Sequence, residues 1–172
     1  KKYLKLTPYS ETTIHTTLNF NEQELYNITK KSKAHTLAKI TKLRLLSIGI
    51  QKFTHITHTR QTIKHANIVV FSHFSSLLTE IHKLLPKSKT LIGKDNNTQR
   101  QKNITWFQNG NGKTLLASYQ VAAQGFNLTN TSHIILLEPP WNYATIQQAI
   151  DRAHRLGNIH HIQVTHLITK NS

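Results

Sequence analysis

Residues 134–168 read IILLEPPWNYATIQQAIDRAHRLGNIHHIQVTHLI and combine two short apolar runs with an amphipathic stretch between them. The runs at residues 134–137 and 164–168 have the apolar character of buried strands. Residues 143–154 have apolar side chains at helical spacing. Two neighbouring parallel strands require a long crossover connection, which is usually a helix. This segment therefore predicts a strand, a helix and a second strand of a parallel sheet.

The same alternation of strands and helices precedes this segment. Apolar runs predict strands at residues 68–71, 90–92 and 115–117, and helical spacing predicts helices at residues 75–85 and 98–108. Such alternation is typical of a sheet with helices on both faces. We therefore predict an α/β fold of three layers with a mostly parallel sheet.

The first third of the chain is more polar and is predicted to form a short helical lead-in. Apolar spacing predicts helices around residues 22–28 and over residues 37–46, and weak alternation at residues 13–18 predicts a strand before them. Residues 54–65 are rich in Thr and His and are the candidate boundary. We predict a lead-in over residues 1–66 and the main lobe over residues 67–172.

The length of 172 residues and the composition favour one soluble, basic domain. The formal net charge of +15 suits a nucleic-acid partner, because basic side chains attract phosphate. The scarcity of Met, Cys, Asp, Glu and Gly would also follow from a guanine-poor gene, so both explanations stay open. No apolar run is long enough to span a membrane, and no leader opens the chain. Because methionine is absent, we expect a piece of a longer protein.

The sequence offers neither a phosphate-binding loop nor a metal site. Residues 110–114, GNGKT, look like the end of such a loop, but Phe107 stands where the loop needs glycine. A strand is also predicted to follow Thr114 where a phosphate loop would open a helix. We interpret the segment as a turn and exclude Lys113 as a nucleotide-binding lysine. Cysteine is absent, and the seven Asp and Glu residues include no pair at a strand end for magnesium.

Three side chains of the predicted helix at residues 143–154 suit a phosphate. Gln148, Arg152 and Arg155 follow one another at steps of four and three residues, so a continuous helix would place them on one face. The planar guanidinium group binds phosphate through two hydrogen bonds and stays charged. Spacing alone leaves a solvated helix face as the alternative.

The string itself favours the phosphate-binding alternative. Residues 148–157, QAIDRAHRLG, resemble the sixth helicase motif of the SWI/SNF family of helicase-like ATPases. The resemblance implies the second RecA-like lobe of such a protein. It also implies that Arg152 and Arg155 are arginine fingers, which reach ATP and Mg²⁺ held mainly by the first lobe of the same polypeptide. Asn158 departs from the glutamine that the family usually has at that position.

A fifth motif precedes the sixth in the expected order. Residues 118–128, SYQVAAQGFNL, resemble the motif in which a strand delivers a loop between DNA and nucleotide. Gly125 and Asn127 match this motif, although two alanines replace glycines that are common there. The resemblance assigns nucleotide contacts to Gly125, Asn127 and Gln148, and a DNA contact to Ser118.

The remaining motifs imply DNA contacts. Residues 138–142, EPPWN, resemble the stretch whose tryptophan contacts the minor groove, which nominates Trp141. A half-buried core position is the alternative for this side chain. Residues 70–74, VFSHF, resemble the fourth motif. The residues that the resemblance assigns to the DNA backbone are Ser72, His73 and Arg100.

The resemblance implies the second motor lobe of a DNA-dependent ATPase that translocates on double-stranded DNA, in chromatin remodelling, repair or viral transcription. We expect the piece alone to be inactive. The implied partners are double-stranded DNA and a first lobe, with the nucleosome or the transcription machinery as further candidates and no membrane. The implied location is the nucleus or, for a viral protein, the virion or host cell. A strand-separating helicase lobe and a degenerate lobe that only binds nucleic acid or protein stay open as alternatives.

Overall fold

The computed structural model describes residues 8–33, 35–122, 124–140 and 142–170 of the chain. Within these ranges the strands form a single sheet in the order β1-β6-β5-β2-β4-β3, in which every neighbouring pair is parallel. The strands are β1 (Tyr9–Thr16), β2 (Ile68–Ser72), β3 (Ser88–Leu91), β4 (Thr114–Ser118), β5 (His133–Leu136) and β6 (Ile162–Thr169).

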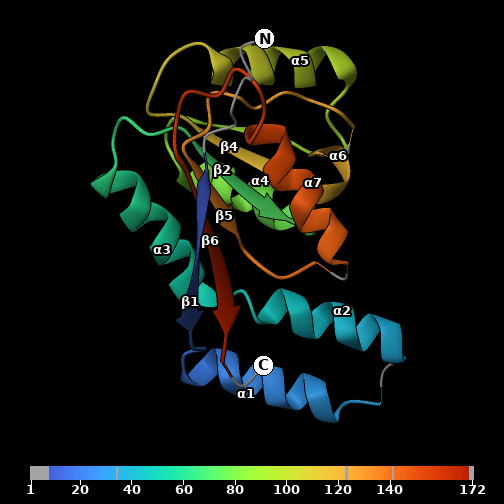
Figure 1. Ribbon diagram of the computed structural model, residues 1–172. Coiled ribbons are helices and arrows are strands. Elements are labelled where there is room, and N and C mark those ends of the chain that lie inside the picture. The colour runs from blue at the N-terminus through green and yellow to red at the C-terminus, as the bar shows by residue number, and fades with distance from the viewer. Residues whose placement is uncertain (1–7, 34, 123, 141, 171–172) are drawn as a thin grey trace.

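Helices lie on both faces of this sheet and at one end of it (Figure 1). No helix in the described ranges is long and apolar enough to cross a membrane. The helices are α1 (Phe20–Lys31), α2 (Thr36–Leu46), α3 (Gly49–Thr62), α4 (Ser75–Leu84), α5 (Asn97–Gln108), α6 (Tyr119–Ala122) and α7 (Tyr143–Ala153).

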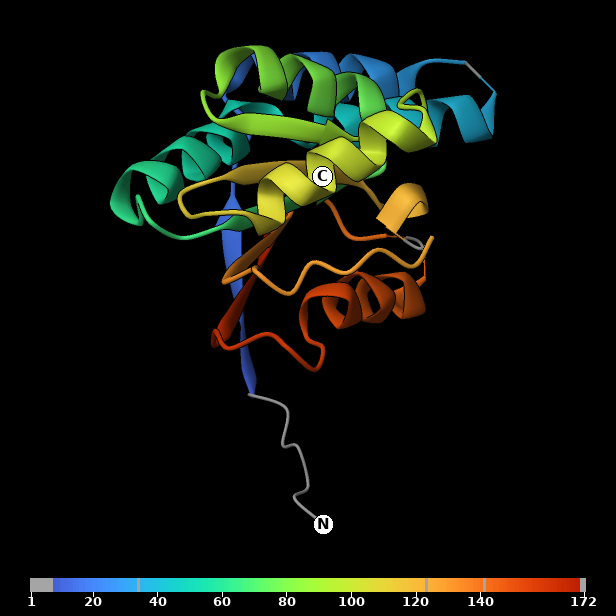
Figure 2. The ribbon, with the colours of Figure 1, turned by 90° about the horizontal axis from the view of Figure 1, so that it is seen from above.

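Strand β2 shows why the fold has three layers. Its side chains alternate between the two faces, so Val69 and Phe71 pack with α5 and α7, whereas Ile68 and Val70 pack with α3 and α4. Figure 2 shows α7 and the pair α3 and α4 on opposite sides of the sheet. All five residues of β2 are buried, as expected for a strand covered on both faces. The predicted three-layer α/β fold is confirmed, and the sheet is parallel throughout the described residues.

The lead-in belongs to the same sheet as the rest of the chain. Strand β1 pairs with β6 over its whole length, from Tyr9 beside Ile162 to Thr16 beside Thr169. The strand predicted at residues 13–18 is thus present but begins earlier. The division at residue 67 stays a prediction, since nothing in the sheet separates the two parts.

Most of the candidate boundary at residues 54–65 belongs to helix α3, for which no helix was predicted. Only Lys52 and Ile56 of this helix are buried. They lie one turn apart, and Phe53 is partly buried against the same cluster, while most of the other residues of the helix are polar. Apolar periodicity is therefore weak there.

Glu22 holds the lead-in helices together at the carboxyl end of the sheet. Its Oε2 accepts a hydrogen bond of 2.8 Å from Asn19 N, and Asn19 Oδ1 accepts one of 2.9 Å from Glu22 N, which forms a capping box at the start of α1. Glu22 Oε1 accepts a further hydrogen bond of 2.8 Å from Ile50 N. One carboxylate therefore fixes the start of α1 to the start of α3.

Candidate functional site

The predicted DNA contacts of the fourth and fifth motifs lie side by side at the carboxyl edge of the sheet. Ser72 ends β2 and Ser118 ends β4, and the two are partners in register. Ser72 is fully buried, and Ser118 is 3% exposed. Ser72 Oγ donates a hydrogen bond of 3.0 Å to Glu138 Oε1 and accepts one of 3.0 Å from Phe74 N. In this conformation neither hydroxyl reaches the surface, and their contacts with DNA stay predictions.

His73 follows β2 and is half-buried. Its backbone N–H donates to Glu138 Oε1, and its ring lies 4.8 Å from the ring of Tyr119, centroid to centroid. Burial lowers the pKa of His73 below its usual value, and the nearby charge of Arg44 lowers it further. The imidazole is therefore neutral at neutral pH. Its Nε2 is buried and has no hydrogen-bond partner among the described residues, and its contact with DNA stays a prediction.

Glu138 occupies the centre of this edge, directly after β5 and Leu137. It is 1% exposed, and Tyr119 Oη donates a hydrogen bond of 3.1 Å to its backbone oxygen. Burial raises the pKa of Glu138 to about 7, against the hydrogen bonds from His73 and Ser72 and the positive charges of Arg44 and Lys52. Its second carboxylate oxygen, Oε2, has no hydrogen-bond partner among the described residues. Glu138 is thus a buried residue that joins the segments after β2, β4 and β5.

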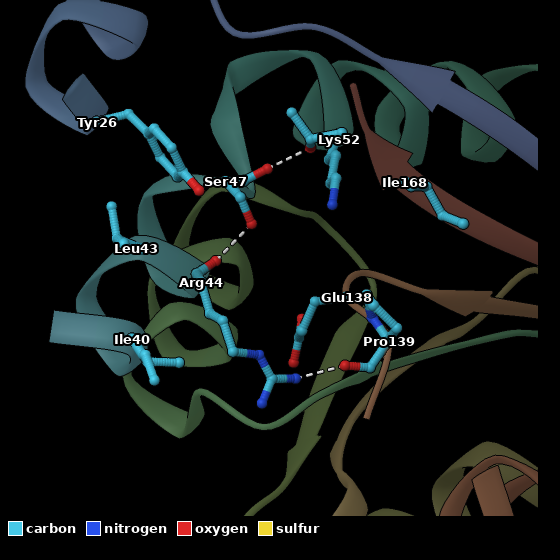
Figure 3. A pocket seen from close by; sticks show the side chains of 10 residues that line it. Tyr26, Ile40, Leu43, Arg44, Ser47, Lys52, Glu138, Pro139 and Ile168 are labelled. Atoms are coloured by element: carbon cyan, nitrogen blue, oxygen red, sulfur yellow. Dashed lines mark hydrogen bonds between the residues drawn. The ribbon is translucent and has the colours of Figure 1, made fainter. Parts of the chain in front are cut away.

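Two basic side chains from the lead-in face Glu138 across a cavity of about 330 Å³ (Figure 3). Lys52 of α3 is 1% exposed and donates a hydrogen bond of 2.6 Å to Leu137 O. Burial lowers the pKa of Lys52 to about 8, although the charge of Glu138 opposes this. Arg44 of α2 donates to Pro139 O. Sequence reasoning missed Arg44 and Lys52, because no motif marks them and they reach Glu138 only through the tertiary fold.

Helix α7 presents the predicted arginine fingers at its carboxyl end. Asn142 Oδ1 caps its start by accepting a hydrogen bond of 2.9 Å from Ala144 N. The helix ends at Ala153, so the prediction of one helical face with three side chains is wrong for Arg155. Gln148 and Arg152 do lie one turn apart on α7, with Gln148 exposed. The sequence signal for the early end is Gly157, whose φ of 103° favours glycine in the turn that follows.

The fifth-motif loop nevertheless meets both arginines. Arg155 Nη1 donates a hydrogen bond of 2.6 Å to Asn127 Oδ1, and Leu128 N donates one of 2.8 Å to Arg152 O. Gly125 has a φ of 94°, and a Cβ added there would lie 4.0 Å from Arg152 Nη1. Four residues predicted to face the nucleotide are therefore neighbours in the structure.

Arg100 is buried and forms its hydrogen bonds within the protein. It is 9% exposed, and its Nη1 donates a hydrogen bond of 2.8 Å to Gln124 Oε1. Its Nη2 donates to Ile92 O at 3.3 Å and to Gly93 O at 3.0 Å. Arg100 thus links the β3–α5 connection to the fifth-motif loop, and its contact with DNA stays a prediction. Trp141, the predicted minor-groove contact, lies outside the described residues.

The GNGKT segment is a turn, as predicted, because strand β4 begins at Thr114. Lys113 Nζ donates to Trp106 O and Asn109 O at the end of α5 and lies 4.8 Å from the centre of the Trp106 ring. An amine held by helix-terminal carbonyls does not form a phosphate cradle. Among the described residues, no group of three His, Asp or Glu side chains could hold a metal ion.

Asn158, which departs from the family's glutamine, closes the turn after α7. Its Nδ2 donates hydrogen bonds of 2.9 Å to both Thr131 O and Ala153 O. The asparagine therefore ties the turn that contains Arg155 to the backbone just before β5.

Comparison with known proteins gives a consistent picture. Residues 49–157 match the model of the helicase conserved C-terminal domain. A DNA repair protein RAD5, from Yarrowia lipolytica, is 34% identical over 121 residues, which cover 68% of this chain and 12% of that protein. The chain therefore spans only about an eighth of the length of this curated relative.

Two solved structures share the fold. The C-terminal part of the Fun30 ATPase domain superposes with a TM-score of 0.80 at 17% identity, over 98% of this chain and 87% of that one. The SWI2/SNF2 ATPase core of Sulfolobus solfataricus, solved in complex with double-stranded DNA, gives a TM-score of 0.70 at 21% identity. That superposition covers 94% of this chain and 41% of the core.

Proposed function

Because the chain belongs to the helicase conserved C-terminal domain family and is a C-terminal lobe of SWI/SNF type, we propose that it is the second motor lobe of a DNA-dependent ATPase that translocates on double-stranded DNA. The observation that carries the proposal is the meeting of Arg152 and Arg155 with the loop of Gly125 and Asn127. A lobe that only binds nucleic acid has no need to hold two arginines against this loop.

The two arginines would act on a nucleotide held mainly by a first lobe. ATP with Mg²⁺ supplies the phosphoryl bond whose cleavage drives such motors. Arg152 and Arg155 would neutralise the charge that develops on the transferred phosphoryl group. This chain offers a turn at Lys113 where a phosphate loop would be needed, so we expect the piece alone to be inactive.

The fifth-motif segment would couple the nucleotide to DNA. It starts at Ser118, at the carboxyl edge of the sheet, and reaches Arg152 through Leu128. Helix α7 runs back from the end of β5 toward the start of β6, so its arginines lie at the opposite end from Ser72 and Ser118. The segment that begins at Ser118, the partner of Ser72 in register, would thus join this predicted DNA edge to the predicted arginine fingers.

Double-stranded DNA and a first lobe in the same polypeptide are the proposed partners. The DNA complex of the Sulfolobus core supports the first, and the small fraction of the RAD5 relative that this chain covers leaves room for the second. That relative is a DNA repair protein, so we propose a repair role in the nucleus and prefer it to the viral alternative. The nucleosome and the transcription machinery stay secondary candidates.

ATPase assays on the full-length protein test the proposal. We expect turnover that double-stranded DNA stimulates, and a loss of roughly 10³-fold in Arg152→Ala and Arg155→Ala. Lys31→Ala, an exposed position at the end of α1, is the control. Unchanged turnover in both arginine variants would contradict the finger assignment. Strand displacement without translocation on intact duplex would favour a strand-separating helicase, and DNA binding without turnover a degenerate lobe.

A further inference from the structure

We infer that Glu138 is a positioning residue for DNA engagement, and that the lead-in helices α2 and α3 hold it in place through Arg44 and Lys52. The inference rests on the proposed function, and it assigns a role in DNA coupling to helices that lie outside the recognised motifs.

Glu138 joins three segments that follow neighbouring strands. Its Oε1 accepts hydrogen bonds from Ser72 Oγ and His73 N after β2, and its backbone oxygen accepts one from Tyr119 Oη after β4. Glu138 itself begins the connection from β5 to α7, which Asn142 ends as the cap of α7. A shift of this one side chain would therefore move the predicted DNA contact His73 relative to the β5–α7 connection.

The lead-in forms hydrogen bonds with the backbone on either side of Glu138. Lys52 donates to the preceding residue, Leu137, and Arg44 donates to the following residue, Pro139. Arg44 and Lys52 come from the consecutive helices α2 and α3, and Glu22 fixes the start of α3 to the start of α1. The backbone around Glu138 thus follows the lead-in as well as the sheet, and a movement of α2 or α3 would reach the DNA edge.

The charges explain why a carboxylate is needed here. Lys52 is buried, and a buried ammonium group is costly without an opposite charge nearby. Glu138 supplies that charge, and Figure 3 shows Glu138, Arg44 and Lys52 around one cavity. Glu138 Oε2 is buried and has no hydrogen-bond partner among the described residues. The ionisable groups around Glu138 are Arg44 from α2, Lys52 from α3, His73 after β2 and Tyr119 from α6.

The pH dependence of this arrangement follows from its two central groups. Burial raises the pKa of Glu138 to about 7 and lowers the pKa of Lys52 to about 8, so the fraction of molecules with both groups charged is largest near these values. Below pH 7 the carboxylate takes up a proton, and above pH 8 the amine loses one. Affinity for DNA should therefore be highest between about pH 7 and pH 8 and should fall on both sides.

The test measures DNA-stimulated ATPase activity of the full-length protein against DNA concentration at several pH values. Glu138→Gln keeps the shape and a hydrogen-bond acceptor but removes the charge. We expect it to raise the DNA concentration for half-maximal stimulation about tenfold, with a smaller effect on turnover at saturating DNA. In this variant the fall in DNA affinity below pH 7 should be absent. Glu138→Asp should restore part of the affinity and its fall at acid pH. Lys52→Met should remove the fall in affinity above pH 8.

Glu80→Gln, an exposed glutamate of α4 beside Lys83, is the matched control and should behave as the wild type. Glu138→Gln with the wild-type DNA requirement and pH profile would overturn the inference. A loss of turnover at saturating DNA as large as the loss of DNA affinity would also overturn the inference, because it would indicate only a damaged fold. Lys52→Met repeats the test independently. A wild-type protein that DNA does not stimulate would overturn the proposed function instead.

Discussion

Arg155 and Asn127 are joined by a hydrogen bond of 2.6 Å, from Nη1 to Oδ1, although Arg155 lies beyond the end of α7. The bond holds the guanidinium group at a defined place on an exposed loop. Because the acceptor is a neutral amide, the bond is weaker than one to a carboxylate. Under the proposed function, the strength of this bond decides how readily Arg155 exchanges the loop for a nucleotide.

Asn127→Asp should lower DNA-stimulated turnover about tenfold, because a carboxylate holds Arg155 through a charge-assisted bond and competes with phosphate. Steady-state ATPase assays at saturating DNA measure the effect. Asn111→Asp is the control, since it adds the same charge at an exposed position in the turn before β4, away from both arginines. Equal turnover in Asn127→Asp and the wild type would show that Arg155 does not act on the nucleotide.

Gly112→Ala should destabilise the chain by about 1–3 kcal/mol. Its φ is +72°, and an added Cβ would lie 2.5 Å from the backbone oxygen of Lys64. Gly93→Ala is the matched control, because a Cβ there meets nothing within 4 Å. Urea unfolding of the two variants side by side measures the difference. Equal midpoints would contradict the close approach of the turn to residue 64.

Ser72→Ala should cost about 1–3 kcal/mol of unfolding free energy, because it removes a buried donor to Glu138 and the acceptor for Phe74 N. The exposed Ser76 of α4 gives the control variant Ser76→Ala. If Ser72 instead acts only as a surface DNA contact, unfolding will be unaffected and only DNA binding will weaken.

The unfolding free energy should depend on pH through Glu138. Its pKa is about 7 in the folded chain and 4.5 as a free side chain, so between these values the folded state binds more protons than the unfolded state. Wild-type stability then falls as pH rises from 4.5 to 7, whereas Glu138→Gln lacks this dependence. Across this pH range the unfolding free energy of Glu138→Gln should rise by about 3 kcal/mol relative to that of the wild type. Urea unfolding across this pH range measures it, and a constant gap would contradict the raised pKa.

Much of the sheet could be predicted because its central strands are buried on both faces and appear as continuous apolar runs. Every strand and helix predicted after residue 67 is present with ends that differ by at most two residues. Helix α3 was missed because only Lys52 and Ile56 are buried and Phe53 is partly buried against the core. A lysine at one of these few inward positions hides the periodicity on which such predictions depend.

The candidate site was predictable where a motif fixes the residue and not where the fold fixes the contact. Gly125, Asn127, Arg152 and Arg155 were found from their motifs, and the structure brings them together. The burial of Ser72 could not be foreseen, because it depends on a carboxylate from another strand. Spacing also extended α7 to Arg155, since a periodic pattern does not show where a helix unwinds.

The pairing of β1 with β6 has a consequence for how the chain acquires its shape. Thr16 and Thr169 are 153 residues apart and yet share a hydrogen bond, so the first strand has no partner until the last one is available. Contacts of such long sequence separation slow folding, because the loop between them must close first. During synthesis β1 would wait as an unpaired edge while the remaining strands assemble. We therefore expect the pairing of β1 with β6 to form late in folding.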